Sequence, residues 1–151
     1  MKPLNTLYVS KENKMELTKS YLTDLIYRVN GAAIEVHKQL GPGLLESVYH
    51  RCLKKELELR DIKFQSEVVV SVNYKGLRLD TELRCDFVVE GVLPVELKAV
   101  QSVLPVHEAQ LMTYMNLLNS PEGLLINFNV TNIFKEGQKT YVNNLYRNLD
   151  D

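Results

Sequence analysis

Apolar residues recur along the first part of the chain with the period of an α-helix. Between residues 21 and 40 they follow i, i+3, i+4 and i+7 spacings: Leu22, Leu25, Ile26, Val29, Ala33, Val36 and Leu40. We expect a helix over 21–40 that stops at Gly41-Pro42, because glycine accepts the left-handed cap and proline cannot continue the helix. A second stripe of the same period predicts a helix over 44–60.

A period of two replaces the helical period after residue 63. Residues 64–74 and 77–89 both predict strands, and Lys75-Gly76 between them predicts a hairpin turn. On the second strand a set of apolar residues shares one face: Leu77, Leu79, Leu83, Cys85, Phe87 and Val89. We expect this face to pack against helices, with Asp86 on the opposite, more polar face.

The remaining segments complete an α/β pattern. A third strand is predicted over 92–100, a helix over 106–119 and a short buried strand over 124–128. The order helix, helix, three strands, helix, strand predicts a mixed four-stranded sheet flanked by helices. The tail, 133–149, fits either a strand or a short helix. We expect a loosely ordered arm over 1–17 and a single domain over 18–151.

A hairpin in the middle of the chain carries the most informative residues. Asp86 lies on its first strand, and Glu96 and Lys98 lie two apart on its second strand, so the latter pair points to one side. Asp86 and Glu96 can face each other only if the connecting loop has an odd number of residues. We therefore predict a three-residue loop or a bulge over 90–92, with Gly91 at positive φ.

Two carboxylates and an ammonium on one side form a candidate metal site. Mg²⁺ is usually held by one or two carboxylates with waters and phosphate oxygens, and Asp86 and Glu96 offer the carboxylates. The carbonyl of Leu97 could add an oxygen. The cation would lower the pKa of its bound water, which Lys98 could orient. Because acid, turn and Glu-x-Lys form a loose pattern, a solvated hairpin face is the alternative.

Two predicted helices offer further polar candidates. Glu46 could join the metal site from the 44–60 helix, or it could be an early-turn glutamate favoured by the helix dipole. Gln110 and Tyr114 share a stripe of the 106–119 helix, where they could position a substrate phosphate or hydrogen-bond at the rim of the core. His107 near the start of that helix is more typical of capping than of catalysis.

Composition changes this picture little. The net charge of −1 and the sequence pI of about 6.3 give no global positive field of the kind that attracts nucleic acid. Cys52 and Cys85 lack the spacing of a zinc site, and we expect reduced thiols. No apolar run approaches the roughly 20 residues that span a bilayer. The start of the chain lacks the apolar stretch of a signal peptide, so we expect a cytoplasmic protein without membrane association.

Several motifs occur together and in one order. They are Gly41-Pro42-Gly43-Leu44-Leu45-Glu46-Ser47-Val48-Tyr49, Tyr74-Lys75-Gly76, Asp86, Val95-Glu96-Leu97-Lys98-Ala99, Gln110-Leu111-Met112-Thr113-Tyr114 and Gly123-Leu124-Leu125-Ile126-Asn127-Phe128. The set resembles the GxxExxY family over about residues 22–130. That family is similar to compact members of the PD-(D/E)XK phosphodiesterase superfamily, so the resemblance implies a restriction-endonuclease-like core.

The resemblance also implies roles for individual residues. Asp86 and Glu96 would be the metal-binding acids, Lys98 the motif lysine, and Glu46 the acid on the helix before the sheet. The pair Gln110 and Tyr114 is similar to the Gln-x-x-x-Tyr motif of recombination-type exonucleases. Cys85 stands where the superfamily's name has proline, a position at which many members lack it.

The implied activity is that of a nuclease that uses Mg²⁺ or Mn²⁺ and a metal-activated water to cut DNA. Two alternatives remain open at this point. One is a non-catalytic nucleic-acid-binding or scaffold protein that retains the fold. The other is a metal-dependent hydrolase of small phosphoesters or nucleotides. A homodimer is a further open expectation, because superfamily members often dimerise.

Overall fold

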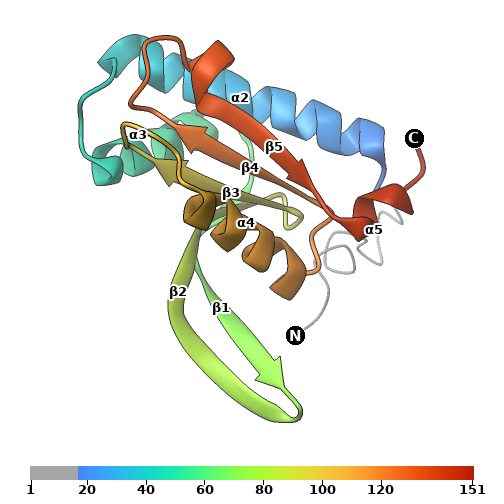
Figure 1. The fold of residues 1–151 in the computed structure, drawn as a ribbon. Helices are drawn as coiled ribbons and strands as arrows, with labels where there is room; N and C mark the ends of the chain where they lie inside the picture. Colours follow the sequence, from blue (N-terminus) through green and yellow to red (C-terminus); the bar gives the residue numbers. More distant parts are fainter. Residues whose placement is uncertain (1–16) are drawn as a thin grey trace.

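A computed structural model describes residues 17–151 (Figure 1). The arm expected over residues 1–17 therefore lies outside the described residues, apart from Leu17. The elements are α2 (Lys19–Leu40), α3 (Glu46–Leu59), β1 (Phe64–Tyr74), β2 (Leu77–Val89), β3 (Leu93–Lys98), α4 (Pro105–Leu117), β4 (Glu122–Asn127), η1 (Ile133–Gly137, a π-helical turn), β5 (Gln138–Val142) and α5 (Asn144–Arg147). The predicted class, a mixed sheet flanked by helices, is confirmed.

The sheet has five strands in the order β1-β2-β3-β4-β5. Only β3 and β4 pair in parallel, because α4 crosses over between them, and the other pairs are antiparallel. The prediction of four strands is therefore wrong by one: the tail that fitted either element contains β5, which pairs along β4, and the short α5. The hydrogen-bonding edge of β4, left open in the predicted order, is covered in this way.

Helices cover both faces of the sheet. Figure 1 shows α2 and α3 on one side and α4 on the other. The larger core cluster joins α2 and α3 to Phe87, Val95 and Leu97 of the sheet. The smaller clusters join α4 to Val88 and Leu125. None of the helices within 17–151 is long and apolar enough to cross a membrane.

The loop between β2 and β3 has the predicted length. The antiparallel register pairs Val89 with Leu93 and Phe87 with Val95, which leaves the three residues 90–92 as the loop. Glu90 and Gly91 both have positive φ, 52° and 72°. The prediction of a three-residue loop with Gly91 at positive φ is confirmed. Continued along the strands, this register brings Asp86 opposite Glu96.

Side-chain alternation along β2 is interrupted beside Asp86. Cys85 packs with Val88 on the α4 side, whereas Phe87 belongs to the cluster on the α2 and α3 side. Strict alternation would place Cys85 and Phe87 on one face, so that part of the prediction is wrong. On the neighbouring strand β1, Glu67 has a φ of 53°, which marks a distortion at the same level of the hairpin.

The far half of the β1–β2 hairpin projects from the body of the molecule (Figure 1). We call residues 71–80 the arm. At its base the pairing shifts register: Val69 pairs with Arg84, but Ser71 pairs with Asp80, so β2 contains two extra residues. Thr81 secures this bulge by donating its hydroxyl to the Val70 carbonyl at 2.6 Å.

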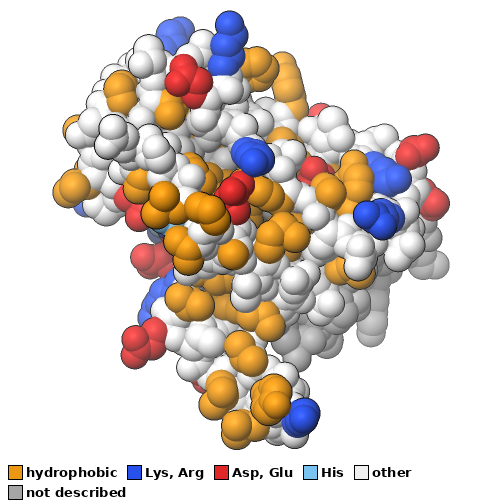
Figure 2. Space-filling view, in the orientation of Figure 1, with side chains coloured by type: hydrophobic (Ala, Val, Ile, Leu, Met, Phe, Trp, Pro, Cys, Tyr) orange, Lys and Arg blue, Asp and Glu red, His pale blue; other side chains and the backbone are white. Residues whose placement is uncertain are grey.

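The arm and its base contradict one expectation for β2. Leu77, Leu79 and Leu83 are 57%, 49% and 44% exposed, although the sequence pattern predicts a face covered by helices. Figure 2 shows hydrophobic side chains gathered over the projecting arm. The physical reason is reach: the hairpin extends beyond the helices, so only the half of β2 nearest β3 is buried.

Candidate active site where two strands separate

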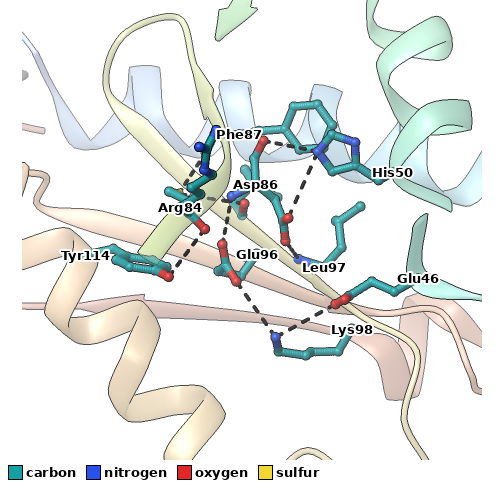
Figure 3. Close-up of polar contacts among 11 residues, drawn as sticks. Glu46, His50, Arg84, Asp86, Phe87, Glu96, Leu97, Lys98 and Tyr114 are labelled. Carbon is teal, nitrogen blue, oxygen red and sulfur yellow. Dashed lines mark hydrogen bonds and ion pairs between the residues drawn. The ribbon is translucent and has the colours of Figure 1, made fainter. Parts of the chain in front are cut away.

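Asp86 and Glu96 meet through reciprocal hydrogen bonds at the point where β2 leaves β3. The backbone N–H of Asp86 donates to Glu96 Oε1 at 2.8 Å, and the backbone N–H of Leu97 donates to Asp86 Oδ2 at 2.8 Å (Figure 3). Backbone N–H groups that have no partner on a neighbouring strand need another hydrogen-bond acceptor when they are buried. Here two carboxylates provide them, and the Asp86 side chain lies between the strands rather than on an open sheet face.

Lys98 and Glu46 complete a group of four charged side chains. Lys98 Nζ lies 3.9 Å from Glu96 Oε2 and 3.8 Å from Glu46 Oε1. Glu96 is 4% exposed, whereas the Glu46 side chain is 47% exposed. Figure 3 shows the four side chains converging from β2, β3 and the start of α3. The structure therefore brings together the residues predicted as metal-binding and catalytic.

The loop before α3 explains how Glu46 is positioned. The Tyr49 hydroxyl donates to the Gly41 carbonyl at 2.6 Å and accepts from the Leu44 N–H at 3.1 Å. The Tyr49 ring is buried and stacks on Phe128 at 4.5 Å. α3 begins at Glu46, two residues later than predicted, because Leu45 keeps extended geometry as the N-cap residue. Glu46 is thus the first helical residue, at the positive end of the helix dipole.

Two glycines allow this loop to turn. Gly41 and Gly43 have φ values of 69° and 98°, which side-chain-bearing residues rarely adopt. The Gly41 N–H donates to the His37 carbonyl at 2.7 Å, so the predicted end of the first helix is confirmed. The spacing of the three residues therefore has a structural basis. Gly43 allows the turn, Glu46 begins the helix, and the Tyr49 ring anchors the loop and the helix start.

Burial and repulsion make the acid pair electrostatically costly without a cation. Burial first, and the neighbouring Asp86 carboxylate second, raise the pKa of Glu96 to about 8. Burial also raises the pKa of Asp86, although the hydrogen bond from Leu97 opposes the shift. Two close carboxylates resist simultaneous ionisation, so near neutral pH the pair retains a proton. A divalent cation would remove this repulsion.

The donor atoms of the pair fit Mg²⁺ or Mn²⁺. Asp86 and Glu96 each use one oxygen for a backbone N–H, which leaves Asp86 Oδ1 and Glu96 Oε2 for a cation. In an extended strand the N–H and C=O of a residue point to the same edge, so the Leu97 carbonyl also faces Asp86. Among residues 17–151, no group of three or more His, Cys, Asp or Glu side chains is placed to hold a metal ion. Mg²⁺ needs only one or two carboxylates, because water and phosphate oxygens fill its remaining positions.

The two residues predicted to position substrate have different surroundings. Tyr114 is 2% exposed and donates its hydroxyl to the Arg84 carbonyl at 3.3 Å. Burial, and then the nearby Glu96, raise the pKa of Tyr114 above its ordinary value. Gln110 is half-buried, and its side chain makes no hydrogen bond or ion pair with the described residues. His107 Nδ1 accepts from the Leu104 N–H at 3.0 Å, which is the capping role expected for it.

His50 lies at the site without having been predicted there. Its ring stacks on Phe87 with centroids 4.5 Å apart, and its Nε2 lies 3.3 Å from the Asp86 carbonyl and 4.0 Å from Asp86 Oδ1 (Figure 3). The available signal was its position four residues after Glu46, which places both side chains on neighbouring turns of one helix. Arg51, next in the chain, lines the same hollow as Glu46 and Asp86.

Comparison with known proteins identifies the class. Residues 23–140 match the profile of the PD-(D/E)XK nuclease superfamily. The match covers more than half of the chain, so the protein belongs to this superfamily, as predicted. Searches of curated proteins and of solved structures found no match. The narrower assignment to the GxxExxY family stays a prediction.

Proposed function

We propose that this protein is a divalent-metal-dependent nuclease that hydrolyses phosphodiester bonds of DNA at the Asp86–Glu96–Lys98 site. The observation that carries the proposal is the reciprocal hydrogen bonding of Asp86 and Glu96 beside the Lys98 ammonium. It combines hard oxygen donors with a cation next to them, inside a chain that belongs to the PD-(D/E)XK nuclease superfamily. Membership of that superfamily supports a nucleic-acid substrate, and DNA is our specific proposal.

Each residue then has a chemical task. Asp86 Oδ1, Glu96 Oε2 and the Leu97 carbonyl would hold Mg²⁺ or Mn²⁺, which supplies a water of lowered pKa. Lys98 places its ammonium where negative charge grows on the phosphate, and it donates hydrogen bonds to orient the attacking water. Glu46 holds that ammonium from the opposite side at 3.8 Å and is available as a further ligand through water. Tyr114 fixes the strand just before Asp86 through the Arg84 carbonyl.

Cleavage of plasmid and single-stranded DNA in Mg²⁺ or Mn²⁺ tests the proposal. Lys98→Ala and Asp86→Asn should each lower the rate by about 10²–10³-fold, as loss of one preorganised charge does at such sites. Lys38→Ala, which removes an exposed lysine from α2, is the matched control and should cut at the wild-type rate. Equal residual cutting by the wild type, Lys98→Ala and Asp86→Asn would indicate a contaminating nuclease and remove the claim.

Two observations favour the alternative of a non-catalytic binding protein with the same fold. The net charge is −1, and residues 17–151 contain no cluster of three metal-binding side chains. Calorimetry with Mn²⁺ separates the two functions. Uptake by the wild type that Glu96→Gln abolishes supports the nuclease, whereas no uptake by the wild type supports the binding protein.

A further inference from the structure

A hollow beside the acid pair opens toward the outer face of α3. It has a volume of about 340 Å³ and is lined by Glu46, Ser47, His50, Arg51, Glu67 and Asp86. The α3 residues of this lining come from the first two turns of the helix, on the side next to the face that buries Tyr49 and Leu53. The hollow therefore connects the candidate active site with an exposed helix face.

The charges of the hollow make Arg51 distinctive. Three of the six lining residues are acidic, so a phosphate chain that entered it would meet strong repulsion. Lys98, on the other side of Glu46, is already placed between two carboxylates. Arg51 is the permanent cation of the lining. It is exposed, and its guanidinium makes no ion pair or hydrogen bond with the described residues, so this group is free to bind an external phosphate.

Basic residues continue along the same helix face. Lys54 and Lys55 follow Arg51 by three and four residues, which makes them its neighbours on the helix surface. Both lysines are exposed, and neither makes an ion pair within the described part of the chain. Helical rise places Lys55 about 6 Å beyond Arg51 along the helix axis, away from the hollow. This step is similar to the one between consecutive phosphates of a nucleic-acid strand. Glu58, one further turn along, ends the basic stretch.

We propose that Ser47, Arg51, Lys54 and Lys55 form a phosphate-binding track, which holds a nucleic-acid strand along α3 on one side of the cleavage site. The inference rests on the proposed function and makes it more specific. The substrate is a polynucleotide whose phosphates beyond the scissile one contact α3. An isolated nucleotide or small phosphoester is too short to make these contacts. The near-neutral net charge of the chain is then compatible with nucleic-acid binding, because the positive charge is local.

Salt-dependent binding measures the track directly. The probe is a fluorescein-labelled single-stranded oligonucleotide, titrated in EDTA at several salt concentrations and followed by anisotropy. Each phosphate neutralised on a single strand contributes about 0.7 to the slope of log K against log salt. The triple variant Arg51→Ala, Lys54→Ala, Lys55→Ala should therefore lower the magnitude of the slope by about 2 and weaken low-salt binding at least tenfold. Alanine favours helix, so α3 should persist, as circular dichroism can check.

The matched control removes the same charge elsewhere. Lys38→Ala, Lys135→Ala, Arg147→Ala lies on α2, η1 and α5, and it should bind with the wild-type slope and affinity. An equal slope for the wild type and the α3 variant overturns the track, and so does a control that loses as much affinity as the α3 variant. A wild type that does not bind the oligonucleotide also overturns it.

Kinetics separate a failure of the track from a failure of the nuclease. With Mn²⁺, the α3 variant should raise KM for the oligonucleotide at least tenfold while kcat stays within twofold. Its hydrolysis of bis(p-nitrophenyl) phosphate, which is too short to span the track, should fall much less than its cleavage of the oligonucleotide. If the wild type cleaves neither substrate but the α3 variant still loses binding, the proposed chemistry fails and the track stands. If cleavage occurs and KM does not move, the track fails and the nuclease stands.

Discussion

The two halves of strand β2 have similar sequence patterns but different environments. Residues 85–89 include Cys85, Phe87 and Val89, all fully buried, whereas Leu77, Leu79 and Leu83 in the other half are 44–57% exposed. The half that contains residues 85–89 has β3 beside it and helices over both faces. The half that contains residues 77–83 pairs with β1 alone and extends into the arm. Period-two alternation thus indicates a strand, but the covering elements decide whether its apolar face is buried.

The candidate site lies at the boundary between these halves. β2 loses β3 as a partner just beyond Phe87, and there the backbone N–H groups of Asp86 and Leu97 bond to side chains instead of strand carbonyls. The carboxylates of Glu96 and Asp86 accept from them. Where the two strands separate, each acid is therefore held by a backbone hydrogen bond from the other strand. The comparison predicts that substitutions at residues 85–96 have large effects on stability or cleavage and that substitutions in the arm have small ones.

Truncation of one side chain in each half should give the largest contrast. Phe87→Ala removes a buried ring that packs against His50 and Phe64, and should lower the free energy of unfolding by about 3–5 kcal/mol. Leu79→Ala in the arm should change it by no more than about 0.5 kcal/mol, because the side chain is half exposed. Urea denaturation of both variants measures this difference. Equal losses would show that the arm packs as firmly as the body.

The acid pair should make stability fall with rising pH in metal-free protein. Folded Glu96 keeps its proton up to about pH 8, whereas the unfolded chain releases it near 4.5. Between these values the folded state binds more protons, so the free energy of unfolding falls as pH rises. At 1.36 kcal/mol per pKa unit, the full rise in the pKa of Glu96 corresponds to about 5 kcal/mol of unfolding free energy. Because water reaching the cleft reduces it, we expect a fall of about 2–3 kcal/mol between pH 5 and 8.5.

Denaturation in EDTA across this pH range, with Glu96→Gln beside the wild type, measures the contribution. Glu122, whose pKa burial raises to about 7, is present in both proteins, so the difference between the curves reports Glu96. The variant should have the flatter curve and the higher stability at alkaline pH. Parallel curves would contradict the assignment of a raised pKa to Glu96.

Tyr114→Phe should have a moderate effect that distinguishes structure from substrate contact. Loss of the hydrogen bond to the Arg84 carbonyl should cost about 0.5–1.5 kcal/mol of stability, since the ring remains buried. If the hydroxyl only fixes β2 beside Asp86, kcat falls several-fold and KM for DNA is unchanged. A raised KM with unchanged stability would favour the alternative that Tyr114 contacts the substrate itself.

The arm turn offers the smallest effect, with the opposite sign. Lys75 and Gly76 both have positive φ, 49° and 88°, in a two-residue turn between the paired Tyr74 and Leu77. Asparagine accepts this backbone region more readily than lysine. Lys75→Asn should therefore raise the free energy of unfolding by a few tenths of a kcal/mol, and with it the melting temperature. DNA cleavage should be unchanged. Scanning calorimetry with a parallel cleavage assay measures both quantities, and a loss of activity would place the arm tip in the functional machinery.

Local patterns were sufficient to predict much of the fold. Helical periodicity located α2 and α3, and the requirement that Asp86 face Glu96 predicted the three-residue loop at Gly91. These inferences depend on residues close in sequence. The extra strand β5 and the exposure of Leu79 depend on which distant segments lie alongside, and alternation carries no information about that.

The site shows the same division. Charge spacing and motif resemblance placed Glu46, Asp86, Glu96 and Lys98 together, and the structure connects all four through hydrogen bonds and ion pairs. Nothing in the chain order indicated that His50 would stack on Phe87, because that contact joins α3 to a strand 37 residues away. The direction of the Asp86 side chain, between the strands, depends on where the β2–β3 ladder ends. Reasoning from alternation had placed it on a sheet face.

A crystal soaked in Mn²⁺ tests the central claim most directly. We predict an anomalous peak in the gap between β2 and β3, within coordinating distance of Asp86 Oδ1, Glu96 Oε2 and the Leu97 carbonyl, and no such peak in Glu96→Gln. A fully soaked wild-type crystal without a peak in this gap, or an equal peak in the variant, would contradict the claim that a metal site lies where the two strands separate.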